Sequence, residues 1–166
     1  MANNQPHSSL FVVPSNTINI PQPGILTTGT NSSGGSNNLT DAGQDFTPLV
    51  TNANGYNVTG GVVYQSYTGA FPGAINTVSS VNSATILQMS GSTAAGAYNI
   101  YSSNQDGKTS FTLFVGTGGA GSTLRVLTAA GDDVTLTNLP DSSFVPLQVV
   151  RIFATGTTCS EILALY

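Results

Sequence analysis

Residues 111–166 read FTLFVGTGGAGSTLRVLTAAGDDVTLTNLPDSSFVPLQVVRIFATGTTCSEILALY, and this stretch decides the fold. Short apolar runs alternate in it with Gly, Asn, Asp and Pro, a pattern typical of strands joined by tight turns. Gly131-Asp132 separates two of these runs and predicts a hairpin of 124–128 with 134–137. The C-terminal third of the chain is therefore predicted to be rich in β-strands.

The same punctuation extends back to residue 46. Two further Asx-Gly pairs predict hairpins, since such pairs supply the positive φ that a tight turn needs. Asn54-Gly55 is expected to join 46–51 with 56–59, and Asp106-Gly107 to join 97–101 with 110–115. Five more strands are expected at 61–67, 76–81, 84–89, 146–153 and 161–165, and no segment predicts a helix of ordinary length.

Many short strands without helices predict an all-β fold, specifically an antiparallel β-sandwich of the jelly-roll type. In the run 111–115, Phe111, Leu113 and Val115 share one face of the strand while Phe114 lies on the other. A strand that is apolar on both faces is covered on both sides. Its second cover is then either the other sheet of a sandwich or a neighbouring subunit.

Residues 1–45 have a different composition and predict an extended N-terminal arm ahead of a β-sandwich domain at 46–166. Prolines interrupt regular pairing there, and the tract TTGTNSSGGSNN at 27–38 has nothing to bury. The apolar segments of the arm are candidate contacts with another protein chain, by addition to a sheet edge, or else they pack on their own domain. Their residues are Leu10, Phe11, Val12, Val13, Ile18 and Ile20.

Charge is scarce, at 6% of residues, and the net charge is −4. The three basic residues are Lys108, Arg125 and Arg151, so the clustered cations of a nucleic-acid-binding surface are missing. Little charge also means little repulsion between copies, which favours a homo-oligomer. We expect no membrane partner, since no run approaches the about 20 apolar residues of a bilayer span, and no secretory signal is recognisable at the N-terminus.

The residues that usually carry catalysis are sparse, and we predict no catalytic, cofactor or metal site. His7 is the only histidine and Cys159 the only cysteine, too few for a structural zinc site. The glycine-rich run 116–121 precedes a predicted strand, whereas a phosphate-binding loop opens a helix. Asp132 and Asp133 fit a solvated turn better than an acid–base pair. The chain is thus expected not to be an enzyme.

Arg125 and Arg151 are lone cations within apolar strands, where a half-buried guanidinium normally has a carboxylate partner. Glu161 is one candidate for a structural ion pair, and Asp132 and Asp133 are the others. The pair is expected within one chain or between subunits.

The phrases LFVGTGG, LRV, VTLTNLP and RIFATGTT, in this order before a terminal apolar strand, resemble the spike-base proteins on the heads of tailed bacteriophages and gene transfer agents. The resemblance covers 111–166. It implies a virion protein on the capsid surface, made in the host cytoplasm, that decorates or cements the capsid or forms a spike base. The partners it implies are the major capsid protein, further copies as a trimer or pentamer, and a head fibre protein.

One alternative is a receptor- or carbohydrate-binding module of a fibre or tail, because exposed tyrosines stack well on sugars. The six tyrosines are Tyr56, Tyr64, Tyr67, Tyr98, Tyr101 and Tyr166.

Overall fold

A computed structural model describes residues 8–49, 58–65 and 72–166. In these residues the chain forms two six-stranded antiparallel sheets, and the helical content is one 3-10 turn, η1 (Thr47–Leu49). The all-β antiparallel prediction is confirmed, with the two sheets that a β-sandwich has. The chain divides into two compact units, a terminal unit of Met1–Ile20 with Asn104–Tyr166 and a central unit of Pro21–Ser103.

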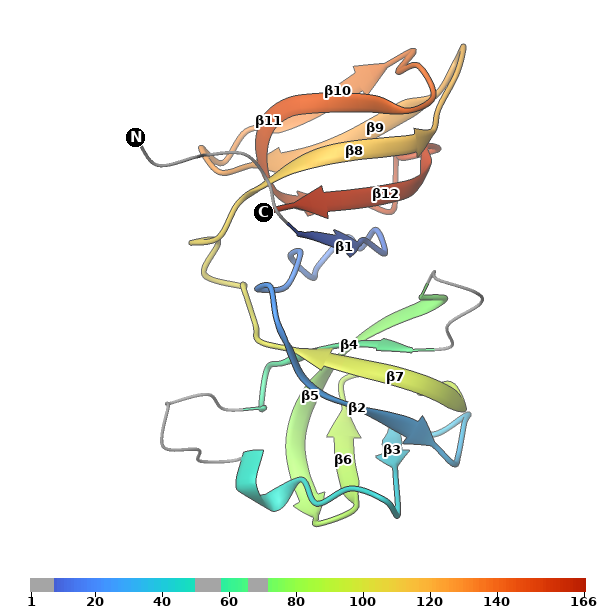
Figure 1. Cartoon of the computed structure of the whole chain (residues 1–166), viewed down its shortest axis with the longest axis vertical. Coiled ribbons are helices and arrows are strands. Elements are labelled where there is room, and N and C mark those ends of the chain that lie inside the picture. Colours follow the sequence, from blue (N-terminus) through green and yellow to red (C-terminus); the bar gives the residue numbers. More distant parts are fainter. Residues whose placement is uncertain (1–7, 50–57, 66–71) are drawn as a thin grey trace. The chain divides into compact units, whose positions relative to one another are not determined.

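The sheet of the terminal unit has the order β1-β12-β8-β11-β9-β10 (Figure 1). Its apolar positions alternate along the strands, so that one face of the sheet forms the core, with Leu113, Val126 and Ala164 completely buried. The strands are β1 (Ser9–Phe11), β8 (Phe111–Thr117), β9 (Thr123–Thr128), β10 (Asp133–Thr137), β11 (Ser143–Ile152) and β12 (Ser160–Leu165).

The hairpin predicted at Gly131-Asp132 is confirmed, because β9 and β10 pair directly around it and Gly131 has a φ of 92°. Strand β11 is long and irregular. Its first part pairs with β8 and its last part with β9, with shifts of register between Val145 and Arg151. Bulges of this kind bend a strand, and β11 is visibly curved in Figure 1. The bend directs the two ends of β11 to different neighbours.

The sheet of the central unit has the order β2-β7-β4-β5-β6-β3. Strand β5 bends as β11 does, pairing with β4 up to Thr77 and with β6 from Val78 onward. The two edge strands, β2 and β3, approach each other, and the Ser32 N–H, directly after β2, donates to the carbonyl of Thr40 in β3 at 2.9 Å. The sheet is thereby curled around its own core. Its strands are β2 (Ile25–Asn31), β3 (Asn38–Thr40), β4 (Val62–Gln65), β5 (Ala74–Ser83), β6 (Ile86–Met89) and β7 (Gly96–Tyr101).

A buried polar network fastens this curled sheet. The Asp41 carboxylate accepts hydrogen bonds of 2.9 Å from the Thr30 N–H, the Gly43 N–H and the Tyr98 hydroxyl. Burial, together with the hydrogen bond to this carboxylate, raises the pKa of Tyr98. Gly29 lies opposite Tyr98 in the sheet, and a Cβ there would collide with the Asp41 carboxylate and lie 2.6 Å from the tyrosine hydroxyl.

The predicted boundary between an arm and a single domain differs from the structure. The predicted arm 1–45 does not stand apart from a domain 46–166. Its described residues supply β1 to the terminal unit, and β2 and β3 to the central unit. Each of these strands pairs with a partner far along the chain, namely β12, β7 and β6 respectively. Local composition does not predict pairing between segments that lie so far apart in the sequence.

The hairpin predicted at Asp106-Gly107 is also wrong. A turn is present, with Gly107 at a φ of 66°, but β7 and β8 on its two sides belong to different units and different sheets. The remaining predicted hairpin, at Asn54-Gly55, lies outside the described residues. Before it, η1 occupies part of the strand that was predicted at 46–51.

Candidate interaction surfaces

The N-terminal strap, residues 8–20, lies along the terminal unit of its own chain. Ser8 and Tyr166 exchange two backbone hydrogen bonds of 3.1 Å, and β1 continues this pairing along β12. Further backbone bonds join Val12 to Ile162 at 2.9 Å and Ile20 to Val150 at 2.9 Å. Of the two arrangements considered from the sequence, the structure has the strap packed on its own chain.

The six candidate arm residues therefore fall into two groups. Leu10, Val12 and Ile20 are buried in the terminal unit, at 7%, 9% and 2% exposure. Their side chains contribute to this unit's own core, which corresponds to the alternative that the segment packs on its own domain. Phe11, Val13 and Ile18 are partly exposed.

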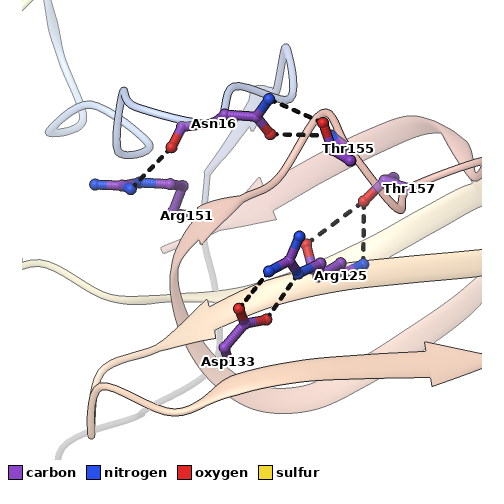
Figure 2. A network of polar contacts seen from close by, with 6 residues as sticks. All are labelled: Asn16, Arg125, Asp133, Arg151, Thr155 and Thr157. Atoms are coloured by element: carbon purple, nitrogen blue, oxygen red, sulfur yellow. Dashed lines mark hydrogen bonds and ion pairs between the residues drawn. The ribbon is translucent and has the colours of Figure 1, made fainter.

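Arg151 anchors the middle of the strap (Figure 2). Its Nε donates to the Asn19 Oδ1 at 2.8 Å, and its Nη1 donates to the Asn16 carbonyl at 3.1 Å. The Asn16 side chain in turn bonds Thr155 twice, as donor to Oγ1 and as acceptor from the backbone N–H, both at 3.0 Å. Neutral oxygens thus satisfy Arg151, and the predicted pairing with Glu161 is not among the ion pairs of the described residues.

Asn104 holds the other end of the strap and is completely buried. Its Nδ2 donates to the Ile20 carbonyl at 3.0 Å and to the Thr109 carbonyl at 2.7 Å. The backbone carbonyl of Asn104 accepts from the Asn19 Nδ2 at 2.8 Å. No local sequence signal indicates this role, because a lone Asn near a turn is ordinary and Ile20 lies 84 positions away.

Arg125 forms an ion pair with Asp133, which is one of the three carboxylates considered from the sequence. Nε and Nη2 donate to the two carboxylate oxygens at 2.9 and 2.6 Å (Figure 2). This contact raises the pKa of Arg125 and lowers that of Asp133. The guanidinium also lies 4.6 Å from the centre of the Phe153 ring. Glu161 instead accepts a 3.1 Å hydrogen bond from the Thr117 hydroxyl.

An apolar row crosses the outer face of the terminal sheet, opposite its core. The pairing register aligns Phe11 of β1 with Leu163 of β12, Leu163 with Phe114 of β8, and Phe114 with Phe144 of β11. The Phe114 and Phe144 rings are in edge-to-face contact, 5.2 Å apart. Phe144 is 65% exposed, and among the described residues only Ile25 is a comparably exposed large hydrophobic. We call these four side chains the outer row.

The outer row includes Phe114, the residue that makes the second face of β8 apolar. This strand is apolar on both faces, and on the second face Phe114 pairs in register with Leu163 and contacts the Phe144 ring. Phe144 was not singled out from the sequence, although the run FVPLQVV offered the same signal of adjacent apolar residues on opposite faces.

The tyrosines are mostly interior. Tyr64, Tyr98 and Tyr101 are 1%, 0% and 6% exposed, so these three do not form a sugar-stacking surface. Tyr166 is partly exposed and contacts the Phe111 ring edge-on. Tyr56 and Tyr67 lie outside the described residues, as does His7. Cys159 is buried.

In the described part of the chain, no three His, Cys, Asp or Glu side chains are grouped so that they could hold a metal ion. Within the same residues, no helix has the length and apolar character needed to cross a membrane. A scan against protein-family models found no match, and searches of curated proteins and of solved structures found no similar chain.

Proposed function

We propose that this chain is a non-enzymatic structural protein of a tailed-phage virion. In this proposal it decorates the capsid surface as a cement or head spike-base subunit, and it acts by binding the major capsid protein and further copies of itself. In this proposal the chain acts by associating with other proteins, and the association is driven by a free energy of about 25 cal/mol for each Å² of apolar surface that is buried.

One observation carries the proposal. The resemblance to head spike-base proteins covers 111–166, and these residues form β8 to β12, five of the six strands in the sheet of the terminal unit. A resemblance that coincides with most of one folding unit is better support than one scattered over parts of several. The sixth strand, β1, is the short edge strand added by the strap.

The outer row agrees with a role in assembly. Exposed aromatic side chains of this kind are enriched at the centres of protein interfaces. The alternative of a carbohydrate-binding module has less support, because it depended on exposed tyrosines and three of the four described tyrosines are buried.

The test is the location of the native protein. Antibody raised against the full chain should detect it in purified virions, and immunogold labelling should decorate their heads. Virions of a mutant phage that lacks the gene provide the control. Absence of the chain from purified virions, or label confined to tails, would contradict the proposal.

A further inference from the structure

We propose that the outer row is a self-association surface, at which the β1, β12, β8 and β11 face of one copy binds the same face of a second copy. The inference deepens the proposed function, because it names the contact through which copies would meet. It rests, however, on the surface itself and can be tested without a virion.

The alternation of side chains puts the whole row outside the core. Phe114 lies between the buried Leu113 and Val115, and Leu163 lies between the buried Ile162 and Ala164. The core of the terminal unit is therefore complete without the row. Phe144, at 65% exposure, is the largest apolar side chain left to solvent on this sheet in the described residues.

The distribution of charge indicates a second copy as the occupant. The strands β1, β8 and β12 contain one charged residue, Glu161, whose carboxylate is already bonded to Thr117. In contrast, β9, β10 and the last part of β11 carry Arg125, Asp133 and Arg151.

In a two-fold symmetric contact each surface meets itself, so every charge at its centre faces its own kind across the axis. Like charges brought together in this way are costly. A surface can therefore be self-complementary most easily where it is uncharged and apolar. The half of the sheet that carries the outer row has Glu161 as its single charge and comes closer to this condition than the half with the two arginines.

The size of the surface predicts a weak contact. Four neighbouring strands at about 4.8 Å spacing span only about 14 Å between the first and the last axis. A standard interface buries about 800 Å² on each partner, and a row of four side chains supplies only its central part. Copies should therefore be mostly monomeric at low concentration. When many copies are held on one particle, the same weak contact is strengthened by the high effective concentration.

The experiment is sedimentation equilibrium of the purified full chain, from about 10 µM to about 1 mM, where a weak contact becomes populated. We expect the wild type to show a reversible rise in mean mass. Phe144→Ser should weaken the association at least about tenfold. Ile25→Ser is the matched control, because Ile25 is 54% exposed but lies in β2 of the central unit, and its association should match the wild type.

Both substitutions are at exposed positions, and equal denaturation midpoints will establish that the variants are folded. A wild type that stays monomeric up to about 1 mM, or association unchanged by Phe144→Ser, would overturn the inference.

Binding of the same variants to virion heads separates this inference from the proposed function. If the chain binds heads but never self-associates, the inference fails and the function stands. If a monomeric chain loses head binding on Phe144→Ser, the row docks on the capsid protein and not on a copy. Self-association through Phe144 by a chain that is absent from virions would leave the inference standing and remove the function.

Discussion

Replacement of Gly29 by Ala tests the buried network of the central unit most sharply. The new Cβ would collide with the Asp41 carboxylate and would lie 2.6 Å from the Tyr98 hydroxyl. That carboxylate is held by three hydrogen bonds and is only 8% exposed, so it cannot turn aside without losing a partner. We expect a destabilised central unit, because an overfilled and bonded site has no room to relax.

The magnitude follows from the two effects involved. Overpacking a well-filled interior costs about 1–3 kcal/mol. Tyr98→Phe alone removes a hydrogen bond to a charged acceptor, which costs about 1.5–3 kcal/mol. In the double variant the missing hydroxyl leaves part of the space that the new methyl group needs. The double variant should therefore be destabilised by less than the sum of the two single variants, and the difference should be at least about 1 kcal/mol.

Urea unfolding followed by circular dichroism will measure these differences, with the transitions of the two units fitted separately if they do not coincide. Gly91→Ala is the matched control. Its Cβ would come no closer than 3.4 Å to any atom of Asn76, and its cost should stay within about 0.5 kcal/mol. Additive costs in the double variant, or a Gly29→Ala variant as stable as the wild type, would show that this network does not constrain the space at residue 29.

Three further predictions concern the terminal unit. Asp133→Asn should lower the melting temperature at neutral pH, because it removes the contact with Arg125. This contact lowers the pKa of Asp133. The stabilisation that the ionised Asp133 contributes is therefore present above the ordinary pKa of 3.8 and is lost as the pH falls through the lowered pKa. Thermal scans should show the difference from the wild type narrowing in acid, and a constant difference would contradict this account. Arg151→Met should speed amide hydrogen exchange in the strap more than Arg151→Lys does, since Lys keeps the charge and one donor, while Arg125→Met should leave the strap unchanged. Leu10→Ala should destabilise the terminal unit by about 2–5 kcal/mol in urea unfolding, and the partly exposed Val13→Ala by less than about 1 kcal/mol; equal costs at the two positions would mean that the strap does not contribute to the core.

The strands and the fold class were largely predictable from the sequence. Alternating apolar residues and Asx-Gly or Gly-Asp turns are local signals, and they located β9, β10 and their hairpin well. Arg125 was also recognised as needing a carboxylate, and Asp133, which lies on the partner strand of the same hairpin, was among the three candidates.

The errors have one physical origin, which is pairing between distant segments. Residues 1–45 contain prolines and polar tracts, yet β1 completes a sheet whose other strands begin at Phe111. Asp106-Gly107 forms a turn, but the strands on either side of it join different sheets. Arg151 was expected to need a carboxylate, and two asparagines of the strap supply neutral oxygens in its place.

The proposed binding of this chain to the surface of a phage head is tested by its copy number on the particle. Recombinant full-length chain is added to heads that lack it, the heads are pelleted, and the bound chains are quantified against the major capsid protein. We predict saturable binding. A few chains per vertex would identify a spike base, and a count that scales with the whole capsid lattice would identify a cement protein. Binding that does not saturate, or no binding at all, would contradict the account.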